Sequence, residues 1–572
     1  RRMTCTTSPS RTGNVGQKRL WFIDGFTSGM PAYNVPGAIH FLEPLNLHAL
    51  ETALSECLGR HDALRTTLPV REGEVVQVIR RNVVSVLPFL DLTDRVKNND
   101  LPGVIRKEIR KPFDLARGPL VRYLLVTYDE DRHVLVVTMH HSIADGTSAK
   151  ILVGELAALY QAFRNEKPSP LPDLPVQFSD YVLWEQNQLA GSEVQGDIDY
   201  WREQLSGVVP LELPTDRPRP GLQSYRGASA PVMLPEELSR AVIEFSRDNQ
   251  VTPFMTLLAA FDILLHRYSG QTDIAVGTPV AGRTHHEFKD VVGCFVNMLV
   301  LRSRLDPDWT VRDLLTHVRT MATAAYGHQS VPFDWLVDTL KPKRDPSRSP
   351  LCQVALVLQP AGKETEERLK AAGLRFEKPD SELGTSRFDL MMDLSETEGG
   401  IRGIIEYNTD LFDPQRIEQM ARNFQVILAS LIADTDSTIH DLDMLTESEG
   451  AEVLQEWNNT VQEFPDESCL HELFENQAAL TPNAPALVFE EQTLTYEEFN
   501  RRANRLAHYL RTMGVGPDSP VGICAERSME MVIGLYGILK AGGAYVPLDP
   551  SYPARRLRLM IDDAGMSIVV RE

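Results

Sequence analysis

The 572-residue sequence lacks several features that would each point to a particular class of protein. No two cysteines are separated by only two residues, which argues against a zinc ribbon, and their wide spacing argues against a disulfide framework. The six cysteines are Cys5, Cys57, Cys294, Cys352, Cys469 and Cys524. No apolar run is long enough to cross a bilayer, and the first residues lack the apolar segment of a signal peptide. We therefore expect a cytoplasmic protein with no membrane partner.

Positive charge is also scarce. The formal net charge is −21, and this negative surplus argues against a nucleic acid as the partner. Hydrophobic residues make up 42% of the chain and charged residues 24%, which indicates a globular protein rather than a disordered one. The length predicts several domains. Because Met3 is internal and the chain stops abruptly at Glu572, we also expect a fragment of a longer protein.

The first 445 residues contain two regions with similar patterns. Helices are expected over residues 46–60, 148–163, 236–248 and 253–268, and in the first of them Leu47, Leu50, Leu54 and Leu58 lie on one face. Strands are expected over residues 122–129, 133–139 and 274–277. Proline-rich breaks at residues 166–174 and 213–221 separate the two regions. We predict an α/β (α+β) fold of two lobes, residues 14–180 and 181–445, with the site in the cleft between them.

The sequence after residue 445 has a different pattern of expected helices and strands. We expect a polar linker over residues 446–468, within a polar, acidic stretch that begins near Ile439. Helices are then expected over residues 496–513, 529–539 and 555–563, and strands over 521–524, 544–547 and 567–570. Helices that alternate with strands indicate a parallel α/β sheet. Residues 469–572 therefore read as the first part of such a domain.

Two adjacent histidines, His140 and His141, stand at the end of an apolar strand. Asp145 and Gly146 follow just before a predicted helix. A strand that ends in a tight turn can aim an imidazole into a cleft, and imidazole transfers protons near neutral pH. A lone histidine is more often a hydrogen-bonded core residue, so the spacing of the whole motif has to decide between the two roles.

The spacing His140-His141-x-x-x-Asp145-Gly146 resembles the active-site motif of nonribosomal peptide synthetase condensation domains. Six other segments resemble the remaining motifs of that family, in the same order. They are residues 17–21, 60–66, 181–184, 293–297, 328–334 and 344–351. Seven ordered matches are far more specific than a single short motif. The resemblance implies a V-shaped, chloramphenicol-acetyltransferase-like fold over roughly residues 14–445.

The resemblance also implies a reaction and its residues. Condensation domains form an amide bond between an upstream carrier-bound thioester and the amine of a downstream carrier-bound aminoacyl thioester. His141 is expected to accept the amine proton or to orient the amine, and His140 to hold the loop. Asp145 would be structural, paired with Arg283, and the amide of Gly146 could polarise the thioester oxygen. A plain turn glycine is the equal alternative for Gly146.

Several other residues fall on the matched motifs. Asn297, Trp184, Arg19 and Arg65 are candidates for lining the substrate channel, although core packing is the simpler role for Trp184. A second histidine pair, His285 and His286, has no spaced set of further metal ligands, so we expect an exposed loop and no metal site.

The tail is similar to the start of an adenylation, or AMP-binding, domain over residues 494–499 and 539–549. The phosphate-binding loop, the ATP-binding aspartate and the C-terminal lysine of that family do not follow, so we predict no adenylation. The expected partners are an upstream donor carrier, a downstream acceptor carrier and the rest of the adenylation domain. This chain would bind no cofactor itself and would instead receive the phosphopantetheine arms of the carriers.

Other members of the same fold remain alternatives. We favour the type that joins an L-donor to an L-acceptor, although Thr147 stands where tryptophan is frequent. An epimerisation domain or a starter domain that uses a fatty acyl group is also open. A heterocyclisation domain would carry aspartate in place of His140, and a dual epimerisation–condensation domain would carry an extra histidine motif. A non-catalytic platform that only docks carriers is the alternative from a different class.

Overall fold

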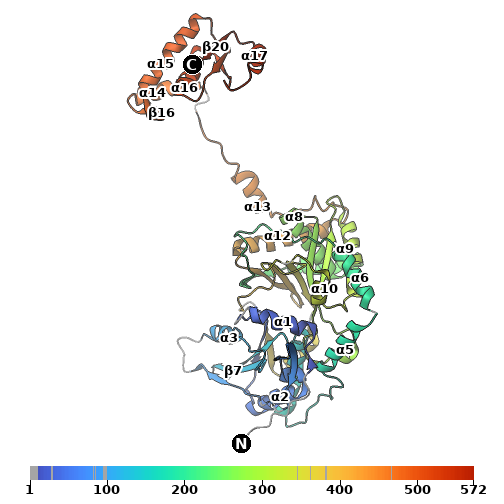
Figure 1. Cartoon of the computed structure of the whole chain (residues 1–572). Coiled ribbons are helices and arrows are strands. Elements are labelled where there is room, and N and C mark those ends of the chain that lie inside the picture. Colours follow the sequence, from blue (N-terminus) through green and yellow to red (C-terminus); the bar gives the residue numbers. More distant parts are fainter. Residues whose placement is uncertain are drawn as a thin grey trace. The chain divides into compact units, whose positions relative to one another are not determined.

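The computed structural model describes residues 11–26, 30–81, 83, 85–93, 100–129, 131–192, 194–343, 345–360, 362–379, 383–464 and 467–571. Met3, Cys5, Arg344 and Glu572, which entered the sequence interpretation, lie outside these ranges. The chain divides into two compact units, Arg1–Glu452 and Val453–Glu572. Figure 1 shows the first unit as two groups of elements, blue N-terminal ones around one sheet and green to tan ones around another.

The N-terminal lobe is built on a five-stranded, mostly antiparallel sheet. Its order is β13 (Leu374–Glu377), β2 (Asn34–Phe41), β8 (Arg132–His140), β7 (Val121–Asp129) and β6 (Phe89–Asp91). A small sheet joins β1 (Arg11–Thr12), β5 (Glu74–Ile79), β3 (Thr66–Thr67) and β4 (Val70–Arg71). The β7–β8 hairpin is the element that carries the histidine pair to the end of the sheet.

Helices α1 to α5 belong to this lobe. They are α1 (Val15–Phe26), α2 (Leu47–Arg60), α3 (Leu101–Ile109), α4 (Gly146–Arg164) and α5 (Phe178–Ala190), with a 3-10 turn at Asp62–Arg65. Asn46 caps α2 by accepting from the amide of Ala49, and the leucines predicted to share one face include the buried Leu50, Leu54 and Leu58. Both α2 and α4 contribute buried apolar residues to the same core cluster.

The C-terminal lobe has a six-stranded mixed sheet. Its order is β11 (Asn297–Arg304), β10 (Asp273–Val280), β12 (Val354–Gln359), β14 (Leu390–Thr397), β15 (Gly400–Asn408) and β9 (Gly227–Met233). The helices are α6 (Val194–Leu205), α7 (Glu236–Asp248), α8 (Pro253–Ser269), α9 (Val311–Gly327), α10 (Phe333–Leu340) and α12 (Pro414–Ala433). Helix α11 (Lys363–Ala371) comes from the same part of the sequence but packs against α4 of the N-terminal lobe. Residues of α8, α9 and α12 pack with the sheet in one large apolar core.

The two lobes exchange structural parts. Strand β13 follows α11 in the second half of the sequence, yet it pairs with β2 of the N-terminal sheet. The loop between β10 and β11 also crosses, because Phe288, Val291 and Phe295 share a core cluster with N-terminal residues such as Ile143. The β10–β11 loop thereby brings side chains of the second lobe to the end of β8.

The expected linker is partly helical. Helix α13 (Glu447–Ala451) begins with a capping box in which Thr446 and Glu449 satisfy each other's backbone amides. A short helical turn continues through Glu452–Glu456. Glu449 also accepts a hydrogen bond from Asn423 of α12, so the first part of this stretch packs on the C-terminal lobe.

The second unit has a three-stranded parallel sheet, as the alternation of elements predicts. The sheet order is β19 (Ala544–Pro547), β18 (Pro520–Cys524) and β20 (Ile568–Arg571), and a hairpin joins β16 (Pro485–Phe489) to β17 (Gln492–Thr495). Its helices are α14 (Leu470–Leu480), α15 (Tyr496–Thr512), α16 (Met529–Ala541) and α17 (Ala554–Asp563).

The mixed α/β class predicted from the sequence is confirmed, with open sheets in both units. Most predicted elements begin or end within one or two residues of the observed ones; α7, for example, covers the predicted residues 236–248. Among the described residues, the helices are too short or too polar to pass through a bilayer.

Candidate active site

The histidine pair stands where β8 gives way to α4. His140 is the last residue of β8 and pairs with Asn34 of β2, and the amide of His141 continues the ladder by donating to the carbonyl of Tyr33 at 2.8 Å. Helix α4 begins at Gly146, with Asp145 as its N-cap. The turn between strand and helix is therefore anchored at both ends by backbone structure.

His140 is buried and bonded within the turn. Only 3% of its surface is exposed, and its Nδ1 lies 2.8 Å from the hydroxyl of Ser142. Its ring meets Phe113 edge-on, with 6.0 Å between centroids. Burial, then the neighbouring His141 and Arg122, lower the pKa of His140 to about 3. A neutral ring held in this way supports the turn.

Asp145 is saturated with hydrogen bonds. Its Oδ1 accepts from the amide of Ser148 at 2.7 Å and from Arg283 Nη2 at 3.1 Å. Its Oδ2 accepts from Arg283 Nη1 at 2.9 Å and from the amide of Phe295 at 3.0 Å. Both members of the ion pair are almost fully buried. This carboxylate has no oxygen left to serve as a second base, and it ties the two lobes together instead.

His141 has a different environment. Its Nδ1 lies 3.9 Å from the buried thiol of Cys294, and within the described part of the chain its Nε2 makes no hydrogen bond. The ring is half-buried. Burial, then the charge of Arg387, lower its pKa to about 4, although Asp145 and the ring's own backbone carbonyl act in the opposite direction. His141 is therefore neutral at pH 7, with Nε2 available to a substrate.

Gly146 is exposed at the start of α4. A Cβ placed on it would meet no atom within 4 Å, and its φ is not positive. The packing and backbone of the protein therefore do not themselves require glycine here. Its amide belongs to the first turn of a 19-residue helix, where the helix dipole favours negative charge.

Three further residues, which the sequence interpretation did not single out as site residues, support this site. Ser148 Oγ donates to the carbonyl of Gly293 at 2.8 Å and accepts from Arg283 Nη2 at 2.9 Å, which adds a second connection between the lobes. Gln17 Nε2 donates to the carbonyl of Ser142 at 2.9 Å, and Ser142 in turn holds His140. Ser148 stands at the N3 position of a helix that Asp145 caps, whereas Gln17 and Ser142 had no signal beyond lying in matched motifs.

Two of the channel candidates have well-defined structural partners. Asn297 Nδ2 donates to the carbonyls of Gln329 and Val331 at 3.0 and 2.7 Å, and so holds the loop before α10. The guanidinium of Arg65 donates to the carboxylate of Asp62 and to three backbone carbonyls, those of Leu58, Gly59 and Arg80. Neither is brought to His141 by any contact in the described residues, and their role in the channel stays a prediction.

The other two candidates lie at contacts between distant segments. Arg19 of α1 pairs with Asp334 of α10 at 3.3 Å and lies 5.4 Å from the centre of the Phe333 ring, so it joins the two lobes. Trp184 is half-buried and packs against Tyr181 of its own helix and against Phe288 of the β10–β11 loop, with 5.7 and 5.8 Å between ring centroids. For Trp184 these contacts favour packing.

The second histidine pair is exposed, as expected. His285 and His286 stand at the surface between β10 and β11. Within the described ranges no group of three or more histidine, cysteine or carboxylate side chains is placed to hold a metal ion.

Comparisons with known proteins match this architecture. The family model "Condensation domain" matches residues 14–454, and "AMP-binding enzyme" matches residues 474–572. Chondramide synthase cmdD of Chondromyces crocatus is 40% identical over 562 residues, covering 97% of this chain and 14% of that protein. Gramicidin S synthase 2 of Aneurinibacillus migulanus is 38% identical over 557 residues, covering 97% of this chain and 12% of that protein. The chain thus spans only about a tenth of the length of such relatives.

Solved structures of similar fold agree with these matches. The four-domain nonribosomal peptide synthetase holo-AB3403 has a TM-score of 0.88 at 23% identity, covering all of this chain and 44% of that one, and so shares the fold. The X-domain from teicoplanin biosynthesis has a TM-score of 0.69 at 28% identity, covering 78% of this chain and 100% of that one. Since the condensation model matches well over half of the residues, the chain belongs to the condensation-domain family of nonribosomal peptide synthetases, with an AMP-binding segment after it.

Proposed function

We propose that this condensation domain joins two carrier-bound substrates through an amide bond. An acyl or peptidyl thioester on an upstream carrier supplies the carbonyl group. An aminoacyl thioester on a downstream carrier supplies the amine, and both substrates are L-configured. Phosphopantetheine arms of the carriers deliver the two groups, and the chain itself binds no cofactor.

One observation supports this proposal: within the histidine motif, Asp145 and His141 differ in whether protein groups satisfy their polar atoms. Asp145 uses both oxygens to hold Arg283, Ser148 and Phe295, whereas His141 Nε2 has no protein partner in the described residues. His141 is only half-buried, so this nitrogen can accept a hydrogen bond from a ligand or water without first breaking a contact within the protein. The attacking amine of a substrate is a donor suited to that nitrogen.

The reaction mainly requires that the amine and the thioester be positioned relative to each other. The amine nitrogen attacks the thioester carbonyl carbon, the C–N bond forms, the C–S bond breaks, and the amine proton passes through His141 to the leaving thiolate. Because the pKa of His141 is held at about 4, the ring is neutral but a weak base, so orienting the amine contributes more than full proton abstraction. The amide of Gly146, at the N-terminus of α4, stabilises the oxyanion of the tetrahedral intermediate.

A reconstituted condensation assay tests this function. Donor and acceptor carriers are loaded with L-aminoacyl-phosphopantetheine, and the dipeptidyl thioester is followed by intact-protein mass spectrometry. We expect product with the wild type and a loss of at least about 100-fold with His141→Ala. His286→Ala, which removes an exposed histidine outside the motif, is the matched control and should leave product formation unchanged.

Other outcomes would point to the alternatives. Exchange of solvent deuterium into the donor α-carbon without dipeptide would indicate epimerisation. Product with D-donors, or with fatty-acyl donors alone, would contradict the L-donor assignment.

A docking platform is the second candidate. The X-domain relative has also been solved as a complex with OxyB, so this fold can serve as a binding surface for another protein. Full product formation by His141→Ala, equal to the wild type, would favour that role over catalysis.

A further inference from the structure

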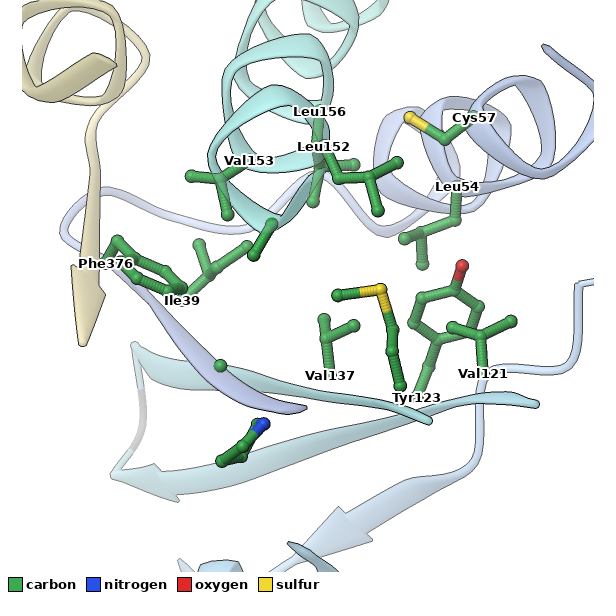
Figure 2. A pocket seen from close by; sticks show the side chains of 14 residues that line it. Ile39, Leu54, Cys57, Val121, Tyr123, Val137, Leu152, Val153, Leu156 and Phe376 are labelled. Atoms are coloured by element: carbon green, nitrogen blue, oxygen red, sulfur yellow. The ribbon is translucent and has the colours of Figure 1, made fainter. Parts of the chain in front are cut away.

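The structure contains several buried cysteines, and one of them contacts the histidine of the proposed reaction. Cys57 lies in a narrow apolar cavity between the N-terminal sheet and helices α2 and α4, where Figure 2 shows it among aliphatic and aromatic side chains. The residues that line this cavity include no histidine. Cys294 is also buried, but its Sγ lies 3.9 Å from Nδ1 of His141. The two thiols are chemically alike and differ in what they contact.

Backbone hydrogen bonds fix Cys294 beside the start of α4. The residue before it, Gly293, donates its amide to Ser148 Oγ at 3.0 Å, and its carbonyl accepts from the same hydroxyl at 2.8 Å. The residue after it, Phe295, donates its amide to Asp145 Oδ2 at 3.0 Å. Because the chain is held on both sides of Cys294, its side chain has a defined position against the turn that carries the histidine pair.

The thiol of Cys294 is shut off from solvent. Only 5% of the residue is exposed, and a Cβ on Gly16 of α1 would lie 4.0 Å from the sulfur. Burial, then the charges of Asp145 and Glu185, raise the pKa of this thiol, so it stays protonated and neutral at pH 7. A buried, protonated thiol is a poor nucleophile, but its sulfur can still act as a weak hydrogen-bond acceptor. Cys294 is thus suited to hold a neighbouring group rather than to react.

The contact with Cys294 bears on which nitrogen of His141 carries the proton. A neutral imidazole has one N–H, and the partner of one nitrogen determines the role of the other. Burial lowers the pKa of His141, whereas a hydrogen bond to its own backbone carbonyl acts in the opposite direction and requires an N–H. Nδ1 is the ring nitrogen next to the backbone, and it is also the one that lies against Sγ. With two acceptors at Nδ1, the lone pair is left on Nε2, which meets the amine in the proposed reaction.

A thiol differs from the group that orients the histidine in other enzymes. In serine-protease triads an aspartate accepts from Nδ1–H, fixes the tautomer and stabilises the imidazolium. Asp145 is a nearby carboxylate, but its oxygens are bonded to other donors. A neutral sulfur orients the ring without adding negative charge. This agrees with a role for His141 in which it orients the amine more than it removes the proton.

We propose that Cys294 is a positioning residue for condensation. Its sulfur, together with the backbone carbonyl of His141, keeps the proton on Nδ1 and the lone pair of Nε2 available to the substrate amine. This role rests on the proposed function, since the amine is the partner of Nε2. The tautomer of His141 does not depend on the reaction and can be measured without substrate.

The tautomer is measured first, by 15N NMR of the histidine-labelled full chain at pH 7.5, with His141→Ala to assign the resonances. The wild type should show His141 protonated at Nδ1 and unprotonated at Nε2. Cys294→Ala should show a mixture of both tautomers, because only the backbone carbonyl then remains as an acceptor at Nδ1. Cys57→Ala removes the buried thiol of the apolar cavity, and as the matched control it should leave the His141 resonances unchanged. A wild-type ring protonated at Nε2, or an unchanged tautomer in Cys294→Ala, would overturn the proposal.

Condensation assays with the same variants test whether this orientation matters for the reaction. Cys294→Ala should lower kcat about fivefold and leave KM for both carriers unchanged, because a fraction of the rings then presents N–H to the amine. Cys294→Ser, whose hydroxyl can also accept from Nδ1, should recover most of this loss together with the Nδ1-protonated tautomer. Equal kcat losses in Cys294→Ala and Cys57→Ala would overturn a specific role of Cys294 in the reaction. A wild type that forms no dipeptide but shows the expected tautomer, lost in Cys294→Ala, would overturn the proposed function and still support the hold of Cys294 on His141.

Discussion

The histidine motif divides into a closed half, His140 and Asp145, and an open half, His141 and Gly146. The two halves differ in whether groups of the protein satisfy their polar atoms. His140 and Asp145 are 3% and 2% exposed, and their polar atoms bond to Ser142 or to Arg283, Ser148 and Phe295. His141 and Gly146 keep exposed surface, and His141 Nε2 has no partner within the described residues. His140 and His141, which carry the same side chain and are neighbours in the sequence, thus have opposite environments.

This difference shows that the type of residue does not determine its role. An aspartate next to a histidine can be a catalytic base, but a carboxylate with four donors stabilises the fold instead. The closed half fixes the end of β8, the start of α4 and the crossing loop that carries Arg283. The open half is then positioned without using His141 Nε2, and a rigid support of this kind is typical of preorganised sites.

Among variants of the closed half, Asp145→Ala should have the largest effect on stability. Removing the carboxylate leaves the buried Arg283 without its counter-charge and removes the N-cap of α4. We expect the free energy of unfolding to fall by about 3–5 kcal/mol, measured by urea denaturation with tryptophan fluorescence. Asp100→Ala is the matched control and should cost only about 1 kcal/mol, because Asp100 caps α3 at an exposed site and forms no ion pair with the described residues.

A double variant separates the contributions to that loss. Asp145→Ala with Arg283→Leu should recover part of the stability, since no charge is then left buried alone. If Asp145→Ala instead unfolds like the wild type and yet forms no product, the carboxylate takes part in the chemistry and the division between the two halves is wrong.

A smaller effect is expected from acid. The folded-state pKa of His140 is about 3, well below the value near 6.5 of an unfolded histidine. Stability from the neutral ring is present above pH 6.5 and is lost as the pH falls toward 3. At pH 5 the loss should be about 2 kcal/mol relative to pH 7.5, measured by urea denaturation across this range.

His140→Gln tests whether this acid sensitivity comes from the closed half. The variant should be less stable at pH 7.5, but its stability should fall less steeply, so that the two curves converge near pH 5. Parallel curves would show that His140 does not titrate in this way. Histidine NMR resonances should agree, with neither His140 nor His141 becoming protonated between pH 8 and 5.

Much of the fold could be predicted because the relevant signals are local. The 3.6-residue spacing of leucines marked α2, and alternating helices and strands marked the parallel sheet of the second unit. The histidine motif was recognisable for the same reason, since its residues occupy one short stretch at the end of β8.

The connections between the lobes could not be predicted from local patterns. Strand β13 pairs with β2 more than 300 residues away in sequence, and no periodicity within residues 374–377 points to that partner. The hydrogen bonds of Ser148 to Gly293 and of Gln17 to Ser142 are likewise long-range. The expectation of a plain linker missed α13, because a capping box stabilises a helix even in a polar, acidic stretch.

In the open half, Gly146→Ala is the variant with the smallest expected effect on stability. Alanine there would place its Cβ in open space at a position with no positive φ, so Gly146→Ala should not lower stability and could raise it by up to about 1 kcal/mol. If a thioester must approach the backbone at this point, the same methyl group should reduce condensation at least tenfold, measured as kcat/KM with L-aminoacyl carriers. Gly154→Ala, on the same helix and also with free space around its Cβ, should keep full activity. Full activity of Gly146→Ala would mean that the substrate does not contact this backbone, and the oxyanion would then need a donor other than the Gly146 amide.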